Sequence, residues 1–140
     1  MDDISKTLLM SIGATLSSPG NVWTTIIPGQ SLIYTPAYSP EFNLFVAVGY
    51  VGTILTSPDG VIWTKRTSGT TNQLVGVVWS GTQFVAVGAG GTILTSPDGI
   101  NWTTRTSGTT YAMYGVVWSG TQFVAVAAAG IIRTSPDGIT

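Results

Sequence analysis

The pentapeptide TSPDG occurs three times in this chain of 140 residues, at 56–60, 95–99 and 134–138, so each copy begins 39 residues after the previous one. The similarity extends beyond these five letters, because residues 77–101 match residues 116–140 at 20 of 25 positions. Looser copies cover residues 38–63 and 12–23. A fixed period of this length indicates a repeat architecture and outweighs any local pattern.

Each period contains four short segments typical of β-strands. In residues 74–106 these are LVGVVWS, QFVAVGA, GTILTS and NWTTRTS, which are rich in β-branched or aromatic residues. Short turn sequences (SGT, GG and SPDG) separate them. Four antiparallel strands with short connections are the pattern of a β-propeller blade. The all-β alternatives are a sandwich, which needs no near-identical repeats, and a β-solenoid, whose coils are usually shorter.

The turn sequences SPDGVIW (57–63) and SPDGINW (96–102) resemble the Asp-box repeats of sialidase-like β-propellers, although one residue of the usual pattern is absent between the Asp and the Gly. The resemblance covers nearly the whole chain. It implies a structural fold-back in which the Asp side chain caps turn amides and the Trp packs between blades. The residues that it assigns to this scaffold are Ser57, Asp59, Gly60, Trp63, Ser96, Asp98, Gly99, Trp102, Ser135, Asp137 and Gly138.

The repeat predicts a single all-β propeller domain of 39-residue four-stranded blades, with about three to three-and-a-half blades per chain. Residues 1–36 are expected to form a worn partial repeat, 37–74 and 75–113 two blades, and 114–140 an incomplete blade that lacks its outer strand. We expect the core between blades to contain the aromatic residues Trp79, Phe84, Trp118 and Phe123.

Propellers typically carry four to eight blades, so three blades are too few to close a ring. The strand VWTTII at 22–27 can supply the outer strand of the last blade, which places Trp23 and Arg133 at the closure. We therefore expect a homo-oligomer, with a six-bladed homodimer as the leading arrangement and a seven-bladed dimer as the alternative.

The composition argues against several partners. Only five Lys and Arg residues are present and the net charge is −1, which disfavours nucleic acid and anionic membranes. The chain contains neither Cys nor His, so we expect no thiolate zinc site, no metal and no cofactor. No apolar run approaches the roughly 20 residues that span a bilayer. No signal peptide is expected, because the apolar stretch 7–16 follows an acidic start; the composition is compatible with a virion or extracellular surface.

The residues also argue against catalysis. The resemblance to sialidases implies an arginine triad, a Tyr–Glu nucleophile pair and a separate acid, whereas Glu41 is the only glutamate. Arg66 and Arg105 occupy the same repeat position on outer strands, which indicates a periodic solvent-exposed site and not a converging triad. Glycoside hydrolysis needs two facing carboxylates, and no such pair can be nominated. We expect a protein that is not an enzyme.

Binding through loops is the function that the sequence favours. The loops 67–74 and 106–114 combine hydroxyls, amides and tyrosines, which suit the hydroxyl fringe and apolar face of a sugar. The candidate ligand-binding residues are Asn72, Gln73, Tyr111, Tyr114 and Tyr38. Alternatively, the tyrosines pack at the seam of a purely structural protein with protein partners only, such as a phage, virion or cell-surface component, or an amplified or engineered propeller fragment.

Overall fold

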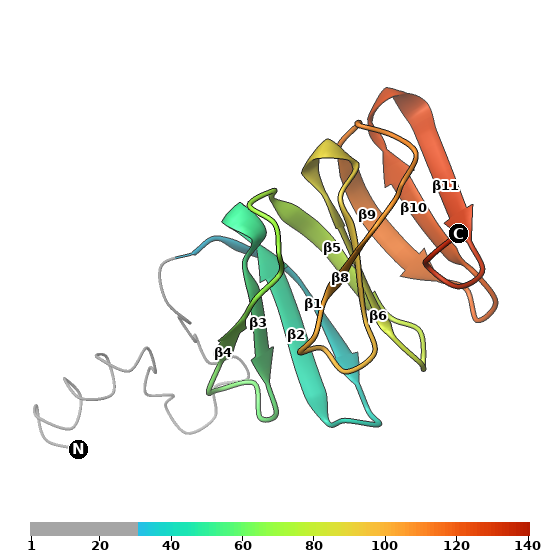
Figure 1. Cartoon of the computed structure of the whole chain (residues 1–140). Coiled ribbons are helices and arrows are strands. Elements are labelled where there is room, and N and C mark those ends of the chain that lie inside the picture. Colours follow the sequence, from blue (N-terminus) through green and yellow to red (C-terminus); the bar gives the residue numbers. More distant parts are fainter. Residues whose placement is uncertain (1–30) are drawn as a thin grey trace, which may run out of the picture. The chain divides into compact units, whose positions relative to one another are not determined.

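The computed structural model describes residues 31–140, and three antiparallel sheets account for the strands in this range (Figure 1). The first sheet contains β1 (Ile33–Ser39), β2 (Leu44–Gly49), β3 (Ile54–Ser57) and β4 (Thr64–Arg66). The second contains β5 (Leu74–Trp79), β6 (Phe84–Gly88), β7 (Ile93–Ser96) and β8 (Thr103–Arg105). The third contains β9 (Met113–Trp118), β10 (Phe123–Ala127) and β11 (Ile131–Ser135).

Within each sheet the strands lie side by side in chain order, as expected for a propeller blade. One-turn 3₁₀ segments join the second strand of each sheet to the third: η1 (Tyr50–Gly52), η2 (Ala89–Gly91) and η3 (Ala128–Gly130). No helix in residues 31–140 has the length and apolar character needed to cross a membrane.

The blade boundaries differ from the sequence expectation, because the inner strands begin earlier. β1 begins at Ile33, inside the segment 1–36 that was expected to precede the first blade. β5 begins at Leu74, where the strand segment LVGVVWS was expected, and β9 begins at the equivalent Met113; both residues lie one position before the blade bounds given above. These first residues pair with the second strand beyond an irregularity in the register, for example Leu74 with Gly88, so they belong to the sheets. The boundary of the sheet is therefore set by a bulge that the repeat pattern does not reveal.

The hairpin of β1 and β2 is longer than its counterpart in the second sheet by one residue pair, Ser39 with Leu44, although both turns contain four residues. Tyr38 pairs with Phe45, seven positions later, whereas Trp79 pairs with Phe84, five positions later. Tyr38 therefore occupies the place in the first sheet that Trp79 occupies in the second. The ring contacts agree, because the centroid distances are 4.7 Å for Tyr38–Phe45 and 4.5 Å for Trp79–Phe84.

Two apolar cores hold the three sheets together. The first core joins the first and second sheets, and Phe84 is fully buried in it with Trp79 and Trp102 packed alongside. The second core joins the second and third sheets, with Phe123 buried and Trp118 packed against it. The aromatic residues predicted for the core between blades thus lie between adjacent sheets.

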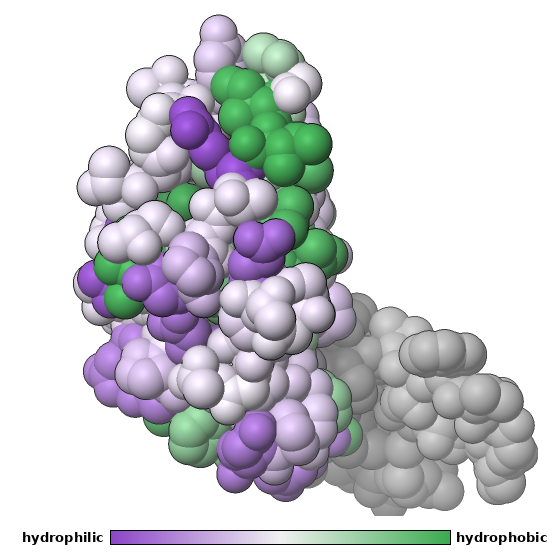
Figure 2. Space-filling view, turned by 90° about the vertical axis from the view of Figure 1, so that its right-hand side faces the viewer, coloured by the Kyte–Doolittle hydropathy of each residue, from purple (hydrophilic) through white to green (hydrophobic). Residues whose placement is uncertain are grey.

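Within residues 31–140, no other element packs on the second face of the third sheet. Four apolar side chains on this outer face are exposed: Tyr114 (61%), Val117 (59%), Val126 (46%) and Ile132 (65%). Their repeat equivalents on the second sheet include Val78, Val87 and Ile93, which pack in the second core. Figure 2, which views the molecule from the side of the third sheet, shows hydrophobic side chains gathered there. This surface is called the outer face of the third sheet below.

Candidate functional site

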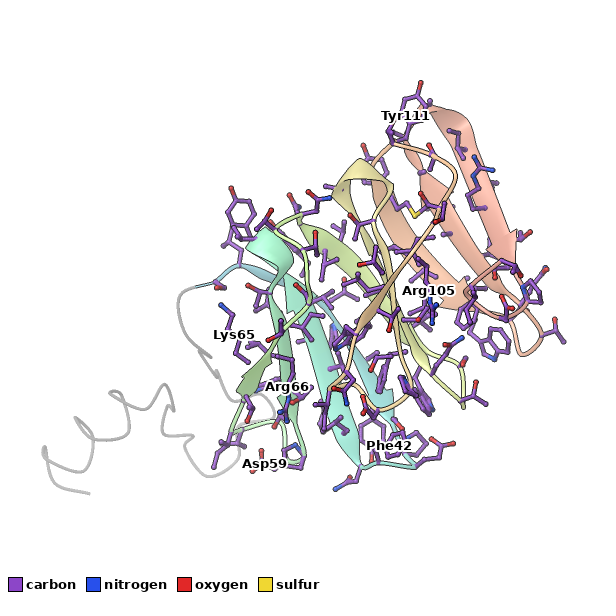
Figure 3. All side chains as sticks on the ribbon, viewed as in Figure 1. Phe42, Asp59, Lys65, Arg66, Arg105 and Tyr111 are labelled. Carbon is purple, nitrogen blue, oxygen red and sulfur yellow. The ribbon has the colours of Figure 1, made fainter. Side chains whose placement is uncertain are left out.

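The strand order gives the sheets two chemically different ends (Figure 1). At the turn end, short turns connect the first strand to the second and follow the third strand, as in residues 40–43 and 58–63. At the loop end lie the 3₁₀ segments and the connections 67–73 and 106–112 that lead to the next sheet. Figure 3 shows Asp59 and Phe42 at the turn end and Tyr111 at the loop end.

At the turn end, each SPDG turn is closed by its own serine and aspartate. Ser57 Oγ donates to Asp59 Oδ1 at 2.9 Å and accepts the N–H of Gly60 at 2.8 Å. The N–H groups of Val61 and Ile62 donate to Asp59 Oδ1 at 2.8 and 2.9 Å. The same bonds recur in the next two turns. The carboxylates are therefore occupied by turn amides.

These hydrogen bonds keep the aspartates ionised. The backbone N–H of Ile62 and then that of Val61 hold the pKa of Asp59 below its usual value of 3.8. Burial raises the pKa of Asp98, but hydrogen bonds from the backbone and side chain of Asn101 and the backbone of Ile100 outweigh it and bring that pKa to about 2. Turn amides, that of Thr140 first, likewise lower the pKa of Asp137 to about 2. A carboxyl group with a pKa this low is already ionised near neutral pH, so it has no proton to donate as a general acid.

The turn tryptophans complete the fold-back. Trp63 Nε1 donates to the carbonyl of Gly60 at 3.1 Å, and Trp102 Nε1 donates to that of Gly99 at 3.0 Å. Trp102 also packs against Phe84, with ring centroids 6.4 Å apart. Among residues 31–140, no group of three or more Asp or Glu side chains is placed to hold a metal ion.

At the loop end, two open grooves share the same lining positions 39 residues apart. The second groove has a volume of about 770 Å³ and runs along residues 104–111, with walls from 69–72 and 90–92. The first groove has a volume of about 830 Å³ and is lined by residues 51–52 and 65–71. Both volumes fall within the roughly 300–1,000 Å³ of small-molecule sites. Serine, threonine and glycine predominate in both linings.

The groove walls are held rigidly by local contacts. Ser107 Oγ donates to the carbonyl of Thr109 at 2.9 Å and accepts the N–H of Thr109 at 3.3 Å. Gly91 lies directly against this turn, because a Cβ built on it would come within 2.0 Å of the Thr109 carbonyl oxygen. Ser68 and Thr70 form the equivalent hydrogen bonds in the first groove. The same local contacts thus stabilise both loops.

Each groove also contains one arginine in the same pose. Arg66 Nε donates to Thr56 Oγ1 at 2.8 Å, and Arg105 Nε donates to Thr95 Oγ1 at 2.8 Å. Figure 3 shows both arginines. Both are half-buried, so they are less exposed than the sequence interpretation of a periodic solvent-exposed position expected. The signal that could have found them is a threonine ten residues before each arginine, diagonally across the β3–β4 or β7–β8 hairpin, since Arg66 pairs with Ile54 and Arg105 with Ile93.

The structure separates the five predicted ligand-binding residues. Asn72 and Tyr111 line the second groove, where Asn72 Nδ2 donates to Thr92 Oγ1 at 2.9 Å and Tyr111 is 51% exposed. Gln73 accepts the N–H of Ala89 through its backbone carbonyl at 2.8 Å, and it lines neither groove.

Tyr114 and Tyr38 lie elsewhere. Tyr114 is on the outer face of the third sheet. Tyr38 lies at the turn end of β1, where its hydroxyl donates to Asn43 Oδ1 at 2.9 Å. The prediction that Tyr38 joins the loop residues is therefore corrected; the extra residue pair of the β1–β2 hairpin hid its equivalence to Trp79.

The residues assigned to closure are described only in part. Trp23 and the strand 22–27 lie outside the described residues, as does most of the segment 1–36. Arg133 Nη2 donates to the carbonyl of Gly108 at 3.2 Å, so it contacts the loop that lines the second groove.

Comparison with known proteins supports the fold. No protein-family model and no curated protein matches the chain. A solved structure described as "YCF48 bound to D1 peptide" is similar, with a TM-score of 0.72 and 18% sequence identity. The match covers 89% of this chain and 43% of that chain, so this chain spans less than half of YCF48 as solved. Since YCF48 is a β-propeller, the three sheets are blades of a propeller-type fold.

Proposed function

We propose that this chain is a non-enzymatic binding module that holds a carbohydrate in the two grooves at the loop end. The observation that carries the proposal is the recurrence of one groove at one repeat position on adjacent blades. A repeated site suits a ligand that is itself a repeating polymer, since two weak contacts on one chain reinforce each other. Polysaccharides are such polymers.

The chemistry of the second groove fits a sugar. Its walls present threonine hydroxyls, the amide of Asn72 and the exposed ring of Tyr111. Hydroxyl and amide groups both donate and accept hydrogen bonds, as the hydroxyls of a sugar do. The Tyr111 ring offers an apolar face with a polar tip, which is suited to a ligand that has an apolar face and a wet edge.

Isothermal titration calorimetry against dextran, xylan and polygalacturonate tests the proposal. We expect binding of at least one polysaccharide, and a loss of at least tenfold in affinity, or about 1.4 kcal/mol, for Tyr111→Ala. Tyr50→Ala is the matched control, because Tyr50 is an equally exposed tyrosine (51%) that lines neither groove. YCF48 was solved with a peptide, so a peptide library is the comparison arm. Binding of peptides and of no polysaccharide would overturn the assignment.

Assembly is a second candidate function, favoured by the outer face of the third sheet. This face repeats the second-sheet surface that Phe123 and Ala125 cover within the same chain. We propose that a second copy of the chain covers it with another blade, in the closed homodimer expected from the repeat. Light scattering then gives about twice the chain mass of 14.6 kDa, and Val126→Lys with Ile132→Lys returns a monomer. A monomeric parent chain would refute this candidate.

A further inference from the structure

We infer that the ligand of the two grooves is an acidic polysaccharide, and that Arg66 and Arg105 bind its carboxylate or sulfate groups through charge-assisted hydrogen bonds. This inference rests on the proposed function and names the ligand class. It is carried by the arginines, whose guanidinium groups are fixed identically by Thr56 and Thr95 at 2.8 Å. A side chain held in place by the protein loses less conformational entropy when it binds a ligand.

The pose leaves the binding edge of each guanidinium available. A guanidinium carries five N–H donors, and the threonine takes only the one on Nε. The two terminal nitrogens form a planar fork that matches the two oxygens of a carboxylate or sulfate. Arg66 and Arg105 are among the residues that line the grooves, and we infer that this fork reaches a ligand held there.

The acidic side chains of residues 31–140 lie away from the grooves. Asp59, Asp98 and Asp137 cap their own turns at the turn end, and Glu41 accepts Trp79 Nε1 there at 2.9 Å. The linings of the two grooves contain the cations Lys65, Arg66 and Arg105 and no Asp or Glu. Although the net charge of the chain is −1, the grooves are therefore locally positive. This separation of charge favours an anionic ligand at the loop end.

Partial burial of Arg66 and Arg105 strengthens their electrostatic attraction to an anionic ligand. Arg66 and Arg105 are half-buried, so an anion in the groove meets them in a medium less screening than bulk water. The two arginines occupy the same repeat position on the outer strands β4 and β8 of adjacent sheets. A polymer with regularly spaced charges can therefore engage both arginines at once, which a single sugar acid cannot.

Matched polymers separate this inference from the proposed function. Polygalacturonate and its fully methyl-esterified form share a backbone and differ in charge, while dextran sulfate and dextran distinguish sulfate from carboxylate recognition. We expect the parent chain to bind at least one charged polymer at least tenfold more tightly than its neutral partner. Equal binding of charged and neutral forms would keep the carbohydrate function and overturn the acidic ligand. Binding of no polymer would overturn both.

Variants localise the charge recognition. Arg66→Gln and Arg105→Gln are each expected to weaken binding of the charged polymer about tenfold, the loss expected for a charge-assisted hydrogen bond. Arg105→Lys keeps the charge without the fork and should recover only part of the affinity. Glu41→Gln is the control, because it changes the net charge by the same amount at the turn end, on a side chain that lines neither groove. A tenfold gain in affinity for Glu41→Gln would show nonspecific attraction of the polymer to net charge and overturn the inference.

Discussion

Substituting Gly91 with alanine tests how firmly the groove floor is packed. Gly91 has φ of +70°, and its new Cβ would lie 2.0 Å from the carbonyl oxygen of Thr109. The left-handed conformation costs an L-residue about 1–2 kcal/mol. The clash adds more, because backbone must move and the two Ser107–Thr109 hydrogen bonds are lost at about 1 kcal/mol each. We expect a total loss of about 3–4 kcal/mol in the free energy of unfolding.

Gly69→Ala is the matched control. Gly69 has φ of +75°, and a Cβ added there would meet no atom within 4 Å, so only the backbone cost of about 1–2 kcal/mol applies. Urea denaturation followed by tryptophan fluorescence measures both variants under the same conditions. The difference of about 2 kcal/mol isolates the contact with Thr109. Two variants that unfold at the same urea concentration would refute this packing of the groove floor.

Two further predictions concern the core and the turns. Phe84→Ala should lower the free energy of unfolding by about 3–5 kcal/mol, as for other buried aromatic residues. Phe42→Ala should lower it by about 1 kcal/mol, because Phe42 is 51% exposed and contacts Trp79 edge-on. Equal losses for the two variants in denaturant titrations would contradict the packing of the first core. Hydrogen bonds lower the pKa of Asp98 from 3.8 to about 2, so its stabilising contribution is present above about pH 4 and is lost as the pH falls towards 2. Asp98→Asn should flatten this dependence in urea midpoints measured from pH 5 to pH 2, and an unchanged slope would argue against the turn hydrogen bonds.

Much of the fold follows from the repeat. The 39-residue period, the four strand segments and the SPDG turns predict the meander sheets, because tight turns leave neighbouring strands no other order. The first blade was less predictable, because it has two extra residues before Phe45. Residues of β1 therefore lie 41 and not 39 positions before their equivalents in β5, as Tyr38 does before Trp79. The bulges that begin β1, β5 and β9 were also hidden, because they depend on pairing across the sheet and not on local sequence.

The candidate site was only partly predictable. Sequence placed Asn72 and Tyr111 in loops, and the structure places both in the second groove. It could not separate Tyr114 from Tyr111, although they are three residues apart, because Tyr114 already belongs to β9. The arginines escaped notice because their significance lies in a contact between strands, Arg105 to Thr95, that forms only after the hairpin closes.

The central claim is that the grooves at the loop end are the ligand site, and amide chemical-shift mapping tests it most directly. Adding polygalacturonate to ¹⁵N-labelled protein should shift the N–H signals of residues 69–72, 90–92 and 104–111, with smaller changes in the SPDG turns. Shifts confined to the SPDG turns or to the outer face of the third sheet would contradict the claim.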